Sequence, residues 1–284
     1  MYSNELFEKR DSTHKIIIIY IVFVVMLVIS LYPLLDVVKI SLRSASRVFS
    51  TDLRLIPEDA TFENFKSLIL DRPYLTWMRN SLFLSVTSSV VGVFLSLTAA
   101  YGFSRYNFSG RTTGLLSFLM TQIFPAPMLL LPTYVLLKNF NLIDTYAGGI
   151  IPFIATSVPF SVWVIKGYFD TIPMSIEESA YLDGANTMQI LFRIMVPLAL
   201  PAIGVVTLNS FMSAWNEFVV SNIVFTMETM QTIPVGLTNM TGALSADWGI
   251  FAAGCIVTAV PVIILFSSMS KIMINGLTLG GVKE

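Results

Sequence analysis

The chain has 284 residues, of which 55% are hydrophobic and 12% charged, and its mean hydropathy is +0.75. This composition lies far outside the range of water-soluble domains and indicates an integral membrane protein. A formal net charge of −1 argues against a nucleic-acid partner, and the single cysteine and single histidine, Cys255 and His14, exclude an internal disulfide and a Cys/His metal cluster.

Six apolar stretches have roughly the 20 residues that are needed to cross a hydrocarbon core about 30 Å thick. Because backbone polar groups must find partners within lipid, each stretch is predicted to be a helix. The first follows "KRDSTHK" and is too long for the apolar part of a signal peptide, so it is predicted to be a retained span. The predicted spans are Ile16–Leu35, Leu82–Phe103, Leu115–Leu137, Ala147–Ile165, Leu198–Val220 and Ile250–Ser270.

Basic residues in the short connections favour an orientation with both termini in the cytoplasm. The cytoplasmic side would then carry Lys9, Arg10, Lys15, Arg105, Arg111, Lys166, Arg193, Lys271 and Lys283. The long loop 36–79 is also rich in Lys and Arg, but it is mixed in sign, and long loops are translocated largely regardless of charge.

Prolines occur in each of the last four predicted spans. The third contains Pro125, Pro127 and Pro132, the fourth Pro152 and Pro159, the fifth Pro201 and the sixth Pro261. Each removes a backbone donor, so each is expected to bend or interrupt its helix. Broken helices are common in transporters and in other membrane bundles alike.

A polar segment, "EESAYLDGANTMQILFRIMVPLALP", separates the fourth span from the fifth. Ser175 and Glu178 have the spacing of a capping box, which predicts a helix from Ile176 to Asp183. Gly184 is suited to end this helix in the left-handed conformation, and Thr187 to cap a second one. From these features alone, the segment is equally compatible with a capped linker and with a docking element.

The spacing of this segment resembles a known family motif. Glu178-Ser179-Ala180, Gly184 after three residues, and "IMVP" at 194–197 after nine more resemble the E-A-A-x3-G-x9-I-x-L-P motif. That motif is typical of inner-membrane permease subunits of ABC importers. Ser179 and Val196 depart from it conservatively. "AWNEF" at 214–218 and "INGLTLGGVKE" at 274–284 are similar to the carbohydrate branch, in particular to MalG-like subunits.

The resemblance implies an ABC importer type I permease fold, with a transmembrane domain over 80–270 and a cytoplasmic coupling loop at 167–197. The loop would dock on a cytoplasmic ATPase subunit through Glu177, Glu178, Ser179, Ala180, Asp183, Gly184 and Pro197. Expected partners are a MalF-like second permease, two copies of the ATPase and an extracytoplasmic solute-binding protein. The sequence has no phosphate-binding G-x-x-x-x-G-K-[ST] loop, so ATP and Mg are expected on the ATPase and no catalytic residue here.

The fifth span carries polar residues on one helical face. Asn209, Ser213 and Asn216 are spaced i, i+4 and i+7, with Glu217 adjacent, and polar groups at membrane depth usually face a pathway. We expect Asn209 and Ser213 to line a translocation path, and Asn216 and Glu217 to lie on it or at the outer interface. Trp77, Trp215 and Tyr146 are predicted to lie in interfacial aromatic belts.

The C-terminal tail, 271–284, contains three glycines, which disfavour a continuing helix. It is either a frayed end or, as the resemblance implies, a contact with the ATPase subunits through Asn275, Gly276, Gly280, Gly281 and Lys283.

Together these features predict a permease subunit of a sugar importer in the cell inner membrane, for maltose, maltodextrin or another oligosaccharide. The alternatives are an importer of glycerol-3-phosphate in the same family, a secondary transporter and a membrane-embedded enzyme. The last two find little support, because the sequence shows no inverted repeat and the spans contain Glu217 as their one acidic or basic residue.

Overall fold

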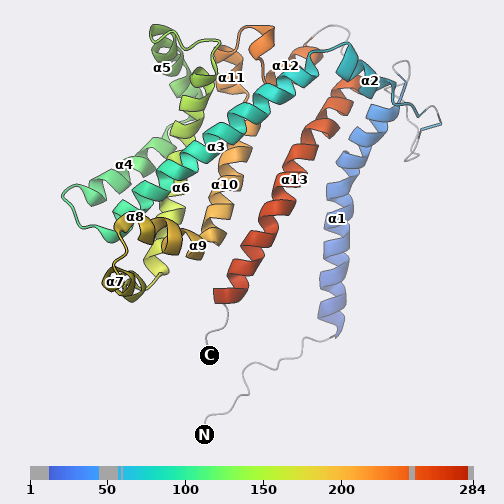
Figure 1. Cartoon of the computed structure of the whole chain (residues 1–284). Coiled ribbons are helices and arrows are strands. Elements are labelled where there is room, and N and C mark those ends of the chain that lie inside the picture. The colour runs from blue at the N-terminus through green and yellow to red at the C-terminus, as the bar shows by residue number, and fades with distance from the viewer. Residues whose placement is uncertain (1–12, 45–56, 59, 243–246, 281–284) are drawn as a thin grey trace. The chain divides into compact units, whose positions relative to one another are not determined.

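The computed structural model describes residues 13–44, 57–58, 60–242 and 247–280. These residues form helices joined by short turns, and no strand occurs among them (Figure 1). The longest helices are α1 (Thr13–Leu42), α3 (Tyr74–Arg105), α6 (Tyr146–Thr171) and α13 (Trp248–Gly280). The others are α2 (Glu63–Leu70), α4 (Arg111–Ile123), α5 (Ala126–Asn139), α7 (Met174–Leu182), α8 (Thr187–Ile190), the π-helical turn η2 (Leu191–Met195), α9 (Val196–Leu198), α10 (Leu200–Trp215), α11 (Val219–Val224), the 3-10 turn η3 (Glu228–Met230) and α12 (Ile233–Thr241).

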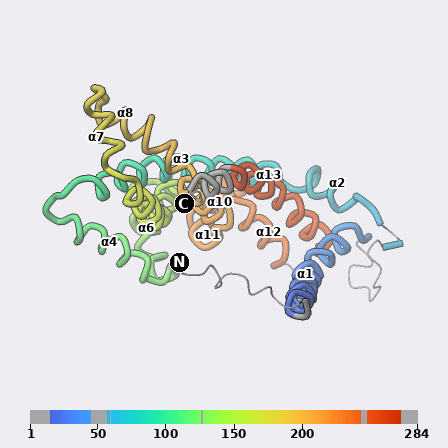
Figure 2. Tube along the Cα trace, turned by 90° about the horizontal axis from the view of Figure 1, so that it is seen from below, coloured from blue at the N-terminus to red at the C-terminus, as the bar shows by residue number. Residues whose placement is uncertain are grey.

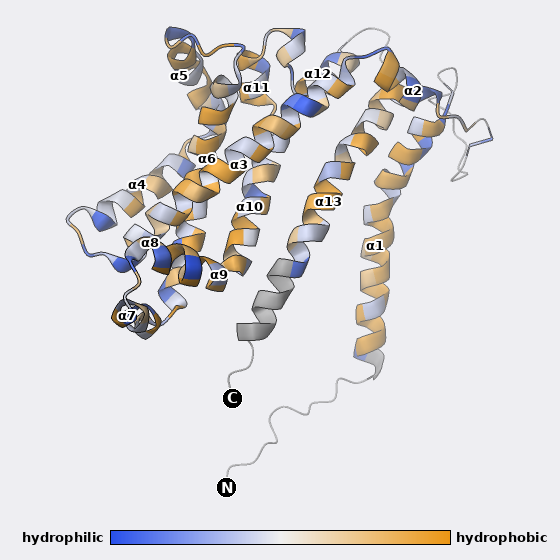
Figure 3. Ribbon diagram, in the orientation of Figure 1, coloured by the Kyte–Doolittle hydropathy of each residue, from blue (hydrophilic) through white to orange (hydrophobic). Residues whose placement is uncertain are grey.

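The described residues contain four helices, α1, α3, α6 and α13, that are long and apolar enough to cross a membrane on their own. Two further pairs meet the same criterion if each is counted as one bent span, which brings the number to the six predicted. The fold is therefore all-α, as the composition and the apolar stretches predict. Figure 3 shows apolar residues along most of α1, whose side chains from Ile16 to Leu35 are all exposed.

The third predicted span, Leu115–Leu137, is not one helix. It is divided into α4 and α5, whose axes differ by 106°. Phe124 has an extended backbone with ψ 127° and precedes Pro125, whose own ψ is 128°. A residue before proline is pushed out of the helical region, and here two successive extended residues turn the chain sharply.

The fifth predicted span is wrong at both ends. Residues 187–198 and α10 meet at an angle of 83°. The break lies at Ala199, between two prolines, and Pro201 has no N–H to offer the carbonyl of Pro197. At the other end the helix stops at Trp215 rather than Val220, and α11 begins separately. Proline alone did not decide these breaks, because α6 contains Pro152 and Pro159 and α13 contains Pro261 without interruption.

One of the two compact units comprises 72–242 and 257–280 of the described residues, and α3, α6 and α10 pack together within it. Close packing is possible because α3 turns small polar side chains toward its neighbours: Ser81, Ser85, Ser88, Ser89 and Ser96 are all buried. A Cβ on Gly92 would lie only 3.2 Å from the hydroxyl of Ser157 on α6. Toward the α7 end of these helices, an apolar cluster includes Ile165, Phe169, Ile190, Met195 and Ala199, each fully buried.

Aromatic residues predicted to lie in interfacial belts are largely inside this unit. Trp77 is 4% exposed and Trp215 2% exposed, so neither faces a membrane interface in this chain. Tyr146 is half-buried and donates a hydrogen bond to the Asn80 side chain over 2.8 Å. Trp77 packs on Gly236 of α12, where a Cβ would lie 2.3 Å from its ring. Their apolar surface therefore packs against protein.

The other compact unit comprises α1, α2 and the first turns of α13, up to Ile256. Loop 36–79 thus contains a helix, α2, that was not predicted. Buried Asn64 on α2 donates to the carbonyl oxygens of Ser41 at 2.9 Å and Arg43 at 2.7 Å, at the end of α1. It satisfies carbonyls that have no partner within a helix terminus. Gly249 of α13 lies close to Asn64, because an added Cβ would come within 2.6 Å of its amide.

Candidate functional site

The segment that resembles the family motif folds as a short helix, α7, followed by a tight reversal into α8. Figure 2 shows α7 and α8 side by side. Ile172 is extended, with ψ 123°, and Pro173 fixes the start of α7 at Met174. The N-cap is Pro173, whose side chain has no hydrogen-bond acceptor, so the predicted Ser175–Glu178 capping box is wrong. Ser175 lies inside the helix, where its carbonyl accepts from the Ser179 hydroxyl at 2.8 Å.

Gly184 ends α7 as predicted. Its φ is +84°, in the left-handed region. The N–H of Gly184 donates to the Tyr181 carbonyl and the N–H of Ala185 to the Ala180 carbonyl, each over 3.0 Å. This pair of bonds defines a Schellman motif. The helix is therefore closed by backbone geometry, and its direction relative to the next segment is fixed.

The second short helix is capped by a different residue from the one predicted. Asn186, not Thr187, is the N-cap of α8. Its side chain accepts from the Gln189 N–H at 2.9 Å, and the Gln189 side chain accepts from the Asn186 N–H at 2.8 Å, which completes a capping box. Thr187 is the first residue of the helix, and its hydroxyl lies 3.3 Å from that of Tyr181 on α7.

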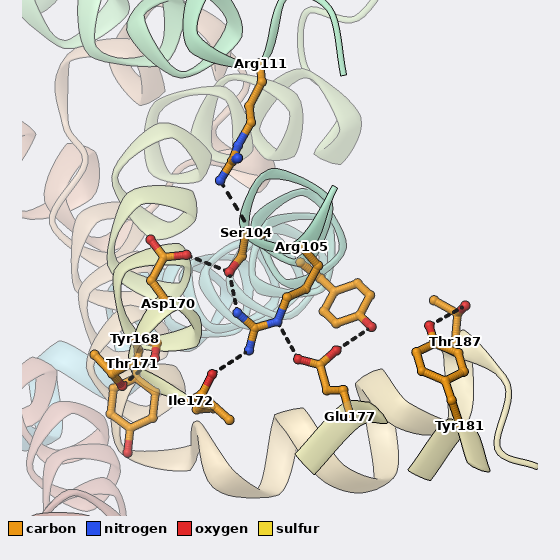
Figure 4. Close-up of polar contacts among 11 residues, drawn as sticks. Ser104, Arg105, Arg111, Tyr168, Asp170, Thr171, Ile172, Glu177, Tyr181 and Thr187 are labelled. Atoms are coloured by element: carbon orange, nitrogen blue, oxygen red, sulfur yellow. Dashed lines mark hydrogen bonds and ion pairs between the residues drawn. The ribbon is translucent and has the colours of Figure 1, made fainter. Parts of the chain in front are cut away.

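The two adjacent glutamates of α7 point to opposite sides. Glu177 is 4% exposed, whereas Glu178 is exposed. The Glu177 carboxylate accepts from the hydroxyl of Tyr101 at 2.8 Å and from the Arg105 guanidinium, both on α3. The Arg105 and Glu177 side chains are only 8% and 6% exposed. Figure 4 shows Glu177 directed from α7 toward Arg105.

Arg105 connects this pair to the end of α6. Its guanidinium donates to the carbonyl oxygen of Ile172 at 3.0 Å and to the Ser104 hydroxyl at 3.1 Å. Ser104 in turn donates to Asp170 at 2.6 Å (Figure 4). The Lys166 ammonium lies 2.5 Å from the same carboxylate. The ends of α3 and α6 and the inner face of α7 are thus joined by one continuous polar network.

The outer face of α7 is open. Ser179, Leu182, Asp183 and Gly184 are exposed along with Glu178, and Leu182 is 90% exposed. Ala180 lies on the other face: it is 8% exposed and packs in the apolar cluster of its own chain. The face therefore offers an apolar side chain flanked by two carboxylates, while Glu177 and Ala180 are occupied within the chain. Pro197 lies outside α7, in α9, and is exposed.

The polar residues predicted to line a path do share one face of α10. Asn209, Ser213 and Asn216 are all exposed, and Asn216 is the C-cap that follows Trp215, the last residue of α10. Glu217 behaves differently, because its carboxylate accepts from the N–H groups of Val220 at 3.0 Å and Ser221 at 2.9 Å. It caps the first turn of α11, a role that favours a negative charge.

The predicted tail falls partly outside the described residues, since Gly281 and Lys283 lie there. The expectation that glycines end the helix is wrong for the rest, because α13 continues through Asn275 and Gly276 to Gly280. A glycine costs about 1 kcal/mol in a helix interior. That cost falls on propagation only, since the preceding turns of α13 already supply the nucleus.

Sequence reasoning missed Tyr101 and Arg105. From the sequence, Arg105 is only a basic residue that indicates orientation, and Tyr101 is one residue of an apolar span. One signal was available: the two lie four residues apart, on one helical face, at the end of a span. Among the described residues, no group of three or more His, Cys, Asp or Glu side chains could hold a metal ion.

Comparison with known proteins relates the chain to one family. Residues 92–274 match the family described as "Binding-protein-dependent transport system inner membrane component". The chain is 37% identical to the inner membrane ABC transporter permease protein YcjP of Escherichia coli K12, over 90% of this chain and 92% of that protein. It is 32% identical to the maltose/maltodextrin transport system permease protein MalG of the same strain, over 97% and 98%.

The fold has a counterpart among solved structures. A bacterial ABC transporter involved in the import of the acidic polysaccharide alginate matches with a TM-score of 0.81 and 25% identity, over 95% of this chain and 98% of that one.

Proposed function

The chain belongs to the family of binding-protein-dependent transport system inner-membrane components, and from this premise we propose that it is a permease subunit of an ATP-driven sugar importer. The observation that carries the proposal is the geometry of α7. Its inner face is fixed to α3 through Glu177, its end is closed by the Schellman motif at Gly184, and its outer face is open. A helix of nine residues has little stability of its own, so these contacts make it a firm docking element.

In this proposal α7 docks on a cytoplasmic ATPase subunit. Glu178 and Asp183 offer negative charge to a basic group on the ATPase, and Leu182 offers apolar surface to a pocket. ATP and Mg are bound on two copies of that subunit, where ATP is hydrolysed, so this chain is a transport subunit rather than an enzyme. Closure of the ATPase pair moves α7, and the spans alternate between inward-facing and outward-facing states. A MalF-like second permease completes the pathway.

A sugar is the best-supported solute. MalG is named for maltose and maltodextrin and the matched structure for alginate, which are all carbohydrates. The exposed face of α10 offers the side chains of Asn209, Ser213 and Asn216, which can exchange hydrogen bonds with sugar hydroxyls. The helix contains no Lys or Arg that would favour a phosphorylated solute such as glycerol-3-phosphate. An oligosaccharide delivered by an extracytoplasmic binding protein is therefore proposed as the cargo.

The C-terminal tail and the orientation complete the proposal. We propose that the chain lies in the cell inner membrane with both termini in the cytoplasm. The C-terminal tail, including Asn275, would lie between the ATPase subunits. Alkaline phosphatase fused after Asn239 should be active, and fused after Asn107 or Ala185 inactive. The reverse pattern would place α7 on the wrong side for an ATPase. Truncation after Met273 should lower stimulated ATPase activity while membrane insertion stays normal.

The central test is a charge reversal on the exposed face. Glu178→Lys should release the ATPase subunit from the complex purified through this chain, because it brings like charge to a basic site. Glu228→Lys, a matched reversal at an exposed residue of η3, should retain it. Equal recovery of the ATPase with both variants would contradict docking through α7. With the intact complex in vesicles, the binding protein loaded with maltodextrin should stimulate ATP hydrolysis more than the same protein with glycerol-3-phosphate.

A further inference from the structure

Glu177 is the one acidic side chain of α7 that is buried, and its carboxylate points into the chain rather than toward solvent. Its two carboxylate oxygens have separate partners: Tyr101 donates to Oε2 and Arg105 to Oε1. Both donors belong to α3 and are spaced by about one helical turn, so they bind the carboxylate from the same face of that helix. A residue that only docked α7 on an ATPase would have no need of this arrangement.

We propose that Glu177 is a positioning residue, which makes α7 move as one body with the inner ends of α3 and α6 through Tyr101 and Arg105. The inference rests on the proposed function, in which α7 receives the motion of the ATPase. Glu178 would then make contact with the ATPase, while Glu177 passes the movement into the membrane-spanning helices. Docking and transmission are thereby assigned to two adjacent residues on opposite faces of one helix.

The contacts of Arg105 fix the arrangement of α7 relative to α3 and the end of α6. Its guanidinium is engaged by the Glu177 carboxylate, the Ile172 carbonyl and the Ser104 hydroxyl, which lie on three different segments. A planar guanidinium can hold three such partners only in a fixed arrangement. Tyr101 is held as well, since its ring packs edge-on against Phe169 of α6, with centroids 6.2 Å apart. Any sliding of α7 along α3 would break several of these contacts at once.

The covalent connection from α7 to α10 is less direct. It passes through the left-handed Gly184, the π-helical turn Leu191–Met195 and the 83° break at Ala199. Each is a departure from regular helix, and π-helical turns are often found at functional sites. A movement of α7 therefore reaches α3 through the two hydrogen bonds of Glu177, but reaches α10 along the chain only through three irregular backbone positions.

The test measures coupling separately from docking and folding. The complete transporter, with ATPase and binding protein, is reconstituted in vesicles, and ATP hydrolysed per solute taken up is measured. Glu177→Gln keeps the shape but removes the charge. We expect it to raise this ratio about 5-fold or more, the lower end of typical coupling energies, while the ATPase still co-purifies. Glu228→Gln, an exposed control, should leave the ratio unchanged, and Glu177→Asp should restore part of the coupling.

A second variant guards against misfolding. Arg105→Met combined with Glu177→Leu replaces the buried pair by apolar side chains, an exchange that folded proteins often tolerate. We expect a stable complex that retains the ATPase but has a raised ratio. A wild-type ratio in both Glu177→Gln and the double variant would overturn the inference while leaving the proposed function intact, and loss of the ATPase from both would assign Glu177 to docking instead. Failure of the unmodified complex to bind an ATPase would instead refute the proposed function.

Discussion

Substitution of Gly184 by alanine tests whether the end of α7 is as rigid as the Schellman geometry indicates. The residue has φ +84°, and a Cβ built on it would meet no atom within 4 Å. Any cost therefore comes from backbone conformation and not from crowding. The left-handed conformation costs an L-residue about 1–2 kcal/mol. Restriction of the unfolded chain offsets about 0.4–1 kcal/mol of this, so Gly184→Ala should lower the free energy of unfolding by roughly 1 kcal/mol.

The chain offers a matched control at Gly167. This glycine lies within α6, and its Cβ would likewise meet nothing within 4 Å, but its φ is not positive. The same change, Gly167→Ala, should raise the free energy of unfolding by up to about 1 kcal/mol, because alanine is the better helix former. Both variants can be compared by titrating the purified chain with dodecyl sulfate in mixed micelles and following helix content.

The refuting result is equally clear. If the two variants shift the midpoint in the same direction, Gly184 is free to leave the left-handed region and α7 is not a rigid element. Gly184→Val should cost more than Gly184→Ala, because the branched side chain is less tolerant of this conformation. In reconstituted vesicles it should also separate ATP hydrolysis from uptake with normal insertion.

Two further predictions concern the turn before α6 and the first turn of that helix. Desolvation raises the pKa of the Asp144 carboxyl group, but three hydrogen bonds from residues 226–227 outweigh this effect. They lower its pKa below the usual 3.8. Because the pKa of Asp144 is lower in the folded state, its contribution to stability is present above about pH 4 and is lost as the pH falls below that value. Asp144→Asn should therefore lose less free energy of unfolding on acidification than the unmodified chain. Equal losses in the two proteins would contradict the assignment. Gly148→Ala would put a Cβ 2.0 Å from the carbonyl oxygen of Leu142 and should lower the free energy of unfolding by about 1–3 kcal/mol. Gly242→Ala is the control, because its Cβ would have its nearest contact 3.9 Å away. It should be close to neutral in the same titration.

Apolar length predicted the number of possible spans but not their shape. Hydrophobicity carries no information about the direction of the chain. The 106° turn at Phe124–Pro125 lies within a continuous apolar stretch, so hydropathy alone could not predict it. Proline density was an incomplete guide for a physical reason: a proline breaks a helix only where the freed carbonyl and the preceding residue adopt another conformation. At Pro152 and Pro261 the helix continues, and nothing local in the sequence distinguishes these positions from Pro125.

Local backbone chemistry was read correctly where one residue type has a unique role, and incorrectly where several compete. Gly184 adopts the left-handed conformation because glycine, which lacks a Cβ, can do so without steric cost. Ser175 and Thr187 could both cap a helix, but the caps are Pro173 and Asn186. A capping residue must lie just outside the helix, and a shift of one or two residues in the start of the helix reassigns the role.

The basic residues on which the predicted orientation rests also have partners in the folded chain. Arg105, Arg111 and Lys166 entered the sequence analysis as charges that remain on the cytoplasmic side. In the structure each has partners within the chain: Arg105 binds Glu177 and the end of α6, Arg111 donates to the carbonyl of Phe103 at 2.8 Å, and Lys166 pairs with Asp170. A count of charges cannot separate these roles, because both place the residue at the end of a span. The partner can be recognised only when α7 is folded back against α3, a contact across 72 residues between Arg105 and Glu177. The basic residues on which the predicted orientation rests thus include Arg105, whose guanidinium also holds α7 against α3 through the Glu177 carboxylate.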